Sequence, residues 1–346
     1  MEPIKVGLVG YGFSGQSFHR PLLTHLEEFD IDCVLSSNAE KVRSDLKEVK
    51  VVSTLDELLS QEVELVVITT PNHLHYKMIK QALLADKHVV VEKPFVTKSE
   101  EGEELLNLAK ERGLLLSVFH NRRWDADFLT IQKLLKDEKL GKLFTYEAHF
   151  DRFRPTIKDR WKENKIEGAG VLYDLGSHLI DQALSLFGKP QWVQADVFPQ
   201  RDSEKAEDYF HITFGYEFLR VQLYSRSIVL APGPRYQLHG LSGSYVKHGM
   251  DRQEEDLKAG KNPFSKNWGI EERDQWGTLS SLSGEEITSE KIPSEKGDYT
   301  QYYKGIYRAL KHKEALPVEP QEALEVIKLI EACQKSSEQK KAVFLD

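Results

Sequence analysis

The sequence predicts an α/β protein in which a doubly wound parallel sheet is followed by an α/β domain with a large, open, mainly antiparallel sheet. Up to Asn121, short runs rich in Val, Ile and Leu alternate with amphipathic stretches, which is typical of parallel strands covered on both faces. Beyond it, apolar and polar residues alternate, as in antiparallel sheets with one exposed face. A length of 346 residues fits about two domains. We expect domains at 1–121 and 122–346, with C-terminal helices able to pack back on the first.

The N-terminal domain is expected to alternate strands and helices. The sequence Thr54-Leu-Asp-Glu57 is a capping box that begins one of these helices. The predicted strands are Ile4–Val9, Ile31–Leu35, Val49–Val52, Leu65–Thr69, His88–Glu92 and Leu114–Phe119. The predicted helices are Gly15–Leu26, Ala39–Leu46, Leu55–Leu59, Leu74–Ala85 and Ser99–Arg112.

The second domain is expected to contain longer strands and fewer helices. Its polar stretch Asp251–Gly297 predicts loops and irregular hairpins, and the chain ends in the apolar tail Val343–Leu345. The predicted strands are Leu143–His149, Gln194–Phe198, Phe210–Tyr216, Arg220–Ile228 and Tyr236–Leu241. The predicted helices are Phe128–Lys136, Tyr173–Phe187, Tyr299–Lys311 and Gln321–Lys335.

Composition narrows the possible partners and location. A formal net charge of −8 disfavours a nucleic-acid or anionic-membrane surface. The apolar runs are too short to cross a bilayer, and the start MEPIK lacks the pattern of a signal peptide. The two cysteines, Cys33 and Cys333, have no metal-ligand spacing and are expected to be reduced core thiols. We therefore expect a cytoplasmic protein without nucleic-acid or membrane partners.

The stretch GYGFSG matches the dinucleotide fingerprint G-x-G-x-x-G. It follows a predicted strand and begins a helix, which is the context that gives the pattern its meaning. Gly10 would permit the tight turn, Gly12 the approach of main-chain amides to a pyrophosphate, and Gly15 close packing of helix and strand. A purely structural glycine turn is the weaker alternative.

The residues after the second strand predict which dinucleotide binds. Enzymes that use NAD usually have Asp or Glu there, accepting from the ribose 2′-hydroxyl. This chain has Ser36 and Ser37, followed by Lys41 and Arg43. Hydroxyls and a cation can bind a 2′-phosphate that a carboxylate would repel. The sequence therefore predicts NADP(H). The alternative is that Lys41 and Arg43 are only solvent-exposed charges on the surface of a helix.

Ligands of such sheets bind at the carboxyl ends of the strands. Thr70-Pro71-Asn72 and His75 follow the fourth strand, and Glu92-Lys93-Pro94 follows the fifth. Desolvation of a lysine at a buried strand end favours its neutral amine, which suits a catalytic role.

In YDLGSHLIDQ, the side chains of Asp174, His178 and Asp181 share one helix face. This face could form a metal site, an acid–base site or an internal salt bridge. No further clustered His or Cys is present to complete a zinc site, so we expect no metal. Asp174 and His178 fit acid–base chemistry, whereas Asp181 fits a salt bridge with an arginine.

With GYGFSG, TPNHLH, VEKPF and YDLGSHLID in this order, the whole chain resembles the Gfo/Idh/MocA oxidoreductases. The segments SVFHNRRWD, HFDRFRP and DRW resemble the bacterial NADP-dependent scyllo-inositol dehydrogenases within that family. Gly168-Ala-Gly170 departs from the consecutive glycines of many members, which leaves the start of the following helix uncertain.

The resemblance implies roles for particular residues. Lys93, Asp174 and His178 would surround the substrate carbon that exchanges hydride with nicotinamide C4. Arg160 and Trp161 match a loop that reaches the cofactor in some members. The other implied cofactor contacts are Gly10, Gly12, Phe13, Ser14, Gly15, Ser36, Ser37, Thr70, Pro71, Asn72, His75, Glu92 and Asn121.

The resemblance and the site chemistry together predict an NADP-dependent dehydrogenase of a cyclic polyol, with scyllo-inositol and its ketone as the best pair. His178 is the expected base and Lys93 the expected partner of the developing oxyanion, although coupled titration leaves the immediate proton acceptor open. The alternatives are a pyranose aldose 1-dehydrogenase and a non-catalytic NADP-sensing regulator on this fold. The half-exposed sheet predicts a dimer or tetramer.

Overall fold

The computed structural model describes residues 2–345, which separate into two compact units. The first unit contains the N-terminal chain through Asn121, together with Gln253–Trp268 and Asp298–Leu324. The second contains Arg122–Arg252, Gly269–Gly297 and the chain from Glu325 onward. Among the described residues, no helix combines the length and the hydropathy that a bilayer crossing requires.

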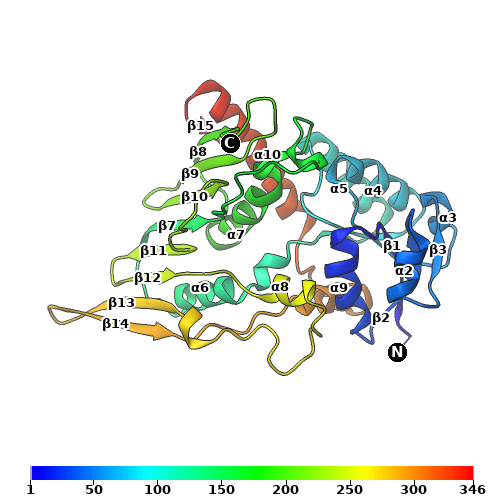
Figure 1. Ribbon diagram of the computed structural model, residues 1–346, viewed down its shortest axis with the longest axis horizontal. Coiled ribbons are helices and arrows are strands. Elements are labelled where there is room, and N and C mark those ends of the chain that lie inside the picture. Colours follow the sequence, from blue (N-terminus) through cyan, green and yellow to red (C-terminus); the bar gives the residue numbers. More distant parts are fainter. Residues whose placement is uncertain (1, 346) are drawn as a thin grey trace. The chain divides into compact units, whose positions relative to one another are not determined.

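The first unit is built on a six-stranded parallel sheet with the order β3-β2-β1-β4-β5-β6 (Figure 1). The strand order reverses between β1 and β4, and a reversal of this kind opens the crevice in which doubly wound sheets bind ligands. The predicted parallel sheet is confirmed, with small differences at the strand ends. The strands are β1 Ile4–Val9, β2 Phe29–Leu35, β3 Lys50–Val52, β4 Leu65–Ile68, β5 His88–Val91 and β6 Leu116–Val118.

Helices flank this sheet, and α4 and α5 pack side by side (Figure 1). The predicted capping box is present, since the Thr54 hydroxyl accepts from the N–H of Glu57 at 3.2 Å. The helices of this unit are η1 Gly15–His19, α1 Arg20–Thr24, α2 Ala39–Asp45, α3 Leu55–Leu59, η2 Asn72–Leu74, α4 His75–Leu84, α5 Ser99–Arg112, α8 Gln253–Lys258 and α9 Thr300–His312. Helix α10, Pro320–Gln339, begins in the first unit and continues in the second.

The predicted helix over Gly15–Leu26 is confirmed in part, because the segment is helical but not regular and ends two residues earlier. The segment begins as the π-helical turn η1 and continues as the short α1, which ends at Thr24. Pro21 lies in the first turn of α1, and because proline has no N–H, it favours the start of a new helical segment there.

The second unit contains a nine-stranded sheet with the order β14-β13-β12-β11-β7-β10-β9-β8-β15, in which only the β7–β10 pair is parallel. This confirms the open, mainly antiparallel sheet. The strands are β7 Leu143–His149, β8 Trp192–Phe198, β9 Tyr209–Gly215, β10 Arg220–Arg226, β11 Tyr236–Gly240, β12 Gly243–Lys247, β13 Gly277–Ser283, β14 Glu286–Ile292 and β15 Val343–Phe344. Its helices, apart from α10, are η3 Asn121–Trp124, α6 Ala126–Lys136, η4 Trp161–Glu163, η5 Leu172–Gly176, α7 Ser177–Phe187 and η6 Arg273–Gln275.

One face of this sheet forms the core of the second unit. Burial alternates along β9 and β10, and the inward side chains pack beneath η5 and α7. The N–H groups of Ala195 and Val197 in β8 each donate to a serine hydroxyl of α10 at 2.9 Å. Helix α10 therefore satisfies main-chain donors of a strand whose neighbour on that side of the sheet is the short β15.

The expectation of irregular structure over Asp251–Gly297 is wrong in part. This stretch contains α8 and a regular hairpin, β13–β14, at the edge of the large sheet. The side chains of β14 are exposed on both faces almost throughout. A strand that buries neither face has no apolar alternation, and its sequence therefore resembles a loop.

Candidate active site

The glycine loop has the geometry that its sequence predicts. Gly10 has a φ of +96°, a left-handed conformation that favours glycine. A Cβ on Gly15 would lie 2.4 Å from the Gly10 carbonyl oxygen, whereas a Cβ on Gly12 would meet no atom within 4 Å. The Thr69 hydroxyl closes the turn, since it lies 3.0 Å from the same Gly10 oxygen. The loop is therefore tight at its ends and open at Gly12, as the approach of a pyrophosphate requires.

A cation and two serines lie close to this loop. The Lys41 ammonium donates to the Tyr11 carbonyl at 3.1 Å, which places it on the glycine loop itself. Ser36 and Ser37 directly follow β2, and the Asn38 side chain caps α2 by accepting from the Lys41 N–H at 2.9 Å. The residues predicted to bind a 2′-phosphate therefore gather at the carboxyl end of β2, next to the glycines.

The segments that follow β4 and β5 are joined by His75. Its Nε2 lies 2.9 Å from the Thr70 carbonyl oxygen and its Nδ1 lies 2.9 Å from the Pro94 carbonyl oxygen. Burial lowers the pKa of His75. The peptide bond between Lys93 and Pro94 is cis. The first unit thus brings the glycine loop, the Thr70–Asn72 segment and Lys93 to one end of its sheet, with Asn121 just after β6.

The second unit carries Asp174 and His178. Asp174 lies in the π-helical turn η5 and His178 in the first turn of α7, so the predicted single helix over Tyr173–Phe187 has an irregular start. His178 is buried, with its ring 6.2 Å from that of Phe150. The Lys162 ammonium donates to Asp174 at 2.7 Å. Sequence reasoning missed Lys162, because it lies in a loop that has no periodic pattern.

Asp181 forms a buried ion pair. Two guanidinium nitrogens of Arg123 donate to its two carboxylate oxygens, at 2.6 Å and 2.9 Å. Both side chains are at least about nine-tenths buried, with relative exposures of 11% for Arg123 and 2% for Asp181. This is the salt bridge with an arginine that the sequence suggested. Asp181 therefore has a structural role and is not included among the proposed catalytic residues.

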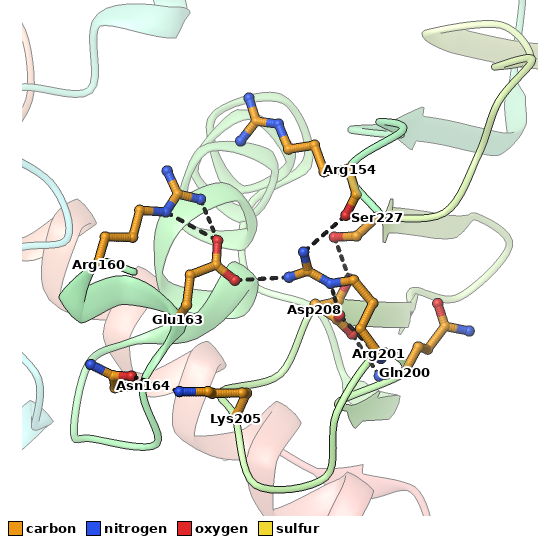
Figure 2. A network of polar contacts seen from close by, with 9 residues as sticks. All are labelled: Arg154, Arg160, Glu163, Asn164, Gln200, Arg201, Lys205, Asp208 and Ser227. Atoms are coloured by element: carbon orange, nitrogen blue, oxygen red, sulfur yellow. Dashed lines mark hydrogen bonds and ion pairs between the residues drawn. The ribbon is translucent and has the colours of Figure 1, made fainter. Parts of the chain in front are cut away.

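A pocket in the second unit opens beside Asp174, and several of its charged side chains form ion pairs. The Arg201 guanidinium donates to Asp208 and, at 2.8 Å, to Glu163, which also accepts from Arg160 at 2.6 Å (Figure 2). The pocket is lined by Phe150, Arg152, Arg154, Arg160, Lys162, Glu163, Gly170, Val171, Asp174, Leu175, Arg201, Glu207, Ser225, Arg226 and Ser227. These pairs hold the loop around η4 against the segment between β8 and β9.

Arg160 and Trp161 belong to this loop of the second unit. Arg160 contacts Glu163, and the Lys162 ammonium lies 5.7 Å from the centre of the Trp161 ring. Their contact with a cofactor stays a prediction, as does the placement of Lys93 opposite Asp174 and His178. Within the described chain 2–345, no group of three or more His, Cys, Asp or Glu side chains is arranged to hold a metal ion.

Glu207, which no sequence pattern gave reason to select, is expected to make the stability of the protein depend on pH. Burial raises its pKa from 4.5 to about 7, although main-chain N–H groups partly oppose the shift. In this window the folded protein binds the proton more tightly than the unfolded chain, so the free energy of unfolding falls as pH rises. Glu207→Gln should remove a fall on the order of 2 kcal/mol between about pH 5 and about pH 8. Urea denaturation of the wild-type and Glu207→Gln proteins over this pH range measures the fall. Free energies of unfolding that change equally with pH in both proteins would contradict the prediction.

Comparison with known families identifies both parts of the chain. A family model described as "Oxidoreductase family, NAD-binding Rossmann fold" matches residues 4–120. Another, described as "Oxidoreductase family, C-terminal alpha/beta domain", matches residues 132–345. The chain belongs to the Gfo/Idh/MocA oxidoreductase family. The predicted family and the prediction of an enzyme that uses a nicotinamide dinucleotide are thereby confirmed.

Several relatives match all or nearly all of the chain. The scyllo-inositol 2-dehydrogenase (NADP(+)) IolW of Bacillus subtilis is 45% identical over 100% of this chain and 97% of its own length. The oxidoreductase YdgJ of Escherichia coli is 43% identical over 95% of each chain. A solved structure of the oxidoreductase yvaA from Bacillus subtilis superposes with a TM-score of 0.97, at 45% identity over 100% of this chain and 99% of its own. This solved structure shares the whole architecture of the chain.

Proposed function

We propose that this Gfo/Idh/MocA oxidoreductase interconverts a cyclic polyol and its ketone with NADP(H), with scyllo-inositol as the best candidate substrate. The observation that carries the proposal is the full-length, 45% identity to a relative named as an NADP-dependent scyllo-inositol 2-dehydrogenase. The chain also contains the three side chains that alcohol oxidation needs, namely Lys93, Asp174 and His178.

Each of these side chains has a role in the proposed reaction. Bound NADP⁺ supplies a hydride acceptor. The His178 imidazole accepts the proton of the reacting hydroxyl, and the Lys93 ammonium stabilises negative charge on the same oxygen. Asp174 orients the substrate by accepting from a neighbouring hydroxyl. Lys162, which donates to Asp174 at 2.7 Å, holds that carboxylate in place and could donate to the same hydroxyl.

The pocket beside Asp174 favours a neutral polyol over a phosphorylated one. Arg160, Arg201 and Arg226 each contact a carboxylate, and Lys162 contacts Asp174. A phosphate would compete with carboxylates for these four cations, with only Arg152 and Arg154 in addition. The hydroxyls of a polyol can use the donors and acceptors as they are arranged. A phosphorylated substrate is a real alternative, because the glucose-6-phosphate 3-dehydrogenase of Bacillus subtilis is 27% identical over 53% of this chain.

A panel of substrates tests the proposal. Inositol isomers, free aldoses and their phosphate esters would each be incubated with NADP⁺ or NAD⁺, and cofactor reduction followed by absorbance. We expect the highest kcat/KM with scyllo-inositol. A higher value for an aldose would establish a sugar dehydrogenase instead. Tight NADPH binding without turnover of any polyol or sugar would indicate the cofactor-sensing regulator.

The same panel tests the preference for NADP⁺. Each charge-assisted hydrogen bond to the 2′-phosphate contributes roughly 1.5–3 kcal/mol, so the ratio of kcat/KM should favour NADP⁺ over NAD⁺ by about tenfold or more. Ser37→Asp should reverse this preference, because its carboxylate repels the 2′-phosphate and accepts from a 2′-hydroxyl. Arg43→Ala tests the alternative that Arg43 is only a solvent-exposed charge on α2. In that case the ratio of kcat/KM for the two cofactors should not change. A wild-type preference for NAD⁺ would contradict the assignment.

We also infer that the enzyme is a cytoplasmic homo-oligomer. The outward face of the large sheet carries a stack of three rings, in which His149 and His211 each lie 4.4 Å from Tyr224 between ring centroids. An aromatic face of this kind could pack against its copy in a two-fold dimer. Both cysteines are buried thiols, as expected in a reducing compartment. Sedimentation at micromolar concentration should give a dimer or tetramer, and a monomer would contradict the inference.

A further inference from the structure

A chain of hydrogen bonds in the first unit runs from α9 to the glycine loop. The hydroxyl oxygen of Tyr303 lies 2.6 Å from Nδ1 of His19, and Nε2 of His19 lies 3.0 Å from Oε1 of Glu92. The same Glu92 oxygen accepts from the Ser14 hydroxyl. The other oxygen, Oε2, accepts from the main-chain N–H of Lys93 at 3.0 Å. The two oxygens of one carboxylate thus join the glycine loop to the residue proposed to polarise the substrate.

The direction of these hydrogen bonds follows from the groups involved. Burial raises the pKa of Tyr303 well above its usual range, so the phenol keeps its proton and donates to Nδ1. His19 then carries its own proton on Nε2 and donates it to Glu92. Burial favours the protonated acid at Glu92, but His19, Lys93 and Ser14 outweigh this effect and lower its pKa to about 2. Glu92 is therefore an ionised acceptor throughout the neutral range.

The surroundings leave His19 little freedom. It is 0% exposed, and its ring packs 4.4 Å from that of Phe119 and 6.0 Å from that of Tyr303. The Glu92 charge also acts on His75, where it raises the pKa against the larger, opposite effect of burial. A buried imidazole held in one tautomer, with each nitrogen engaged, fixes the position of the carboxylate that it contacts.

We propose that His19, oriented by Tyr303, is a positioning residue that fixes the Glu92 carboxylate between the glycine loop and the Lys93 main chain. This inference rests on the proposed function for its kinetic readout. Movement of Glu92 would release the Ser14 hydroxyl and the Lys93 N–H together. His19 should therefore affect cofactor affinity and the chemical step at once, whereas a histidine that only fills the core would affect stability alone.

Two amide substitutions separate these roles, because asparagine reproduces the Nδ1 position of histidine and glutamine the Nε2 position. His19→Gln keeps a donor for Glu92 and loses the contact with Tyr303. His19→Asn keeps a partner for Tyr303 and leaves Glu92 without its donor. Tyr303→Phe removes only the phenol and retains the ring packing. Circular dichroism and thermal denaturation of all three would show whether each is folded.

We expect His19→Asn to raise the NADPH dissociation constant and lower kcat, each by roughly tenfold, the loss that follows from one missing charge-assisted hydrogen bond. His19→Gln should retain most of both properties, and Tyr303→Phe should lie between them.

NADPH titration by fluorescence keeps the test independent of the proposed substrate. If wild type turned over no polyol, the proposed function would fail, yet the affinity difference between the two amide variants would still support the positioning role. Equal losses in His19→Asn and His19→Gln would overturn it, since ring packing alone would then account for His19. Unchanged NADPH affinity and unchanged kcat in a folded His19→Asn variant would overturn it as well.

Discussion

Lys93→Ala is expected to lower kcat/KM for the polyol by about 10²–10⁴-fold, the range that acid–base and electrostatic assistance by one side chain provides. NADPH binding should be retained, because Glu92 contacts the main-chain N–H of residue 93, which alanine also has. Steady-state kinetics and a fluorescence titration on the same preparation measure both quantities.

Lys77 provides the matched control for this substitution. It is exposed on α4 of the same unit, so Lys77→Ala should leave both quantities unchanged. Lys93→Arg tests whether charge alone suffices, since arginine keeps the cation but cannot give up its proton. Near-full activity in Lys93→Ala would show that the proposed chemistry is wrong.

Asp181→Ala is expected to lower the free energy of unfolding by about 3–5 kcal/mol, because it leaves the Arg123 guanidinium buried without its carboxylate. The two carboxylate oxygens accept from Arg123 at 2.6 Å and 2.9 Å. Urea denaturation followed by tryptophan fluorescence and by circular dichroism would measure the change and reveal whether the two units unfold together.

The surface pair between Lys5 and Glu62, whose Glu62 side chain is 90% exposed, gives the control. Glu62→Ala should produce no measurable shift, because solvent screens such pairs. The double variant Arg123→Met with Asp181→Leu should recover much of the stability that Asp181→Ala loses, since both charges are then removed. A single Asp181→Ala variant as stable as wild type would contradict the structural role of this ion pair.

Much of the fold could be predicted, because its signals are local. The apolar runs of the first unit encode buried parallel strands, and the spacing of Gly10, Gly12 and Gly15 encodes the turn between β1 and η1. Asp174 and His178 could be selected because residues four apart lie on one face of a helix. The regularity of the hairpin β13–β14 was not predicted for the opposite reason, because β14 buries neither of its faces and so has no apolar alternation.

The contacts that define the site in detail are not local. His19 and Tyr303 meet across 284 residues of sequence, and their pairing has no periodic signature. Lys162 reaches Asp174 from an irregular loop, so only the folded chain reveals that contact. Glu207 is an ordinary polar residue in the sequence and becomes unusual through burial. Sequence patterns identify the strand ends and helix faces on which the candidate site residues lie. The hydrogen-bond partners of these residues depend on tertiary packing and cannot be read from local patterns.

Transfer of deuterium from substrate to cofactor is the most direct measurement of the proposed reaction. Wild-type enzyme would be incubated with NADP⁺ and scyllo-inositol deuterated at its ring carbons, and the reduced cofactor analysed by mass spectrometry. NADPH carrying one deuterium, formed together with the ketone, is the expected result. NADPH without deuterium, or no reduction of NADP⁺ by this polyol, would contradict hydride transfer from scyllo-inositol.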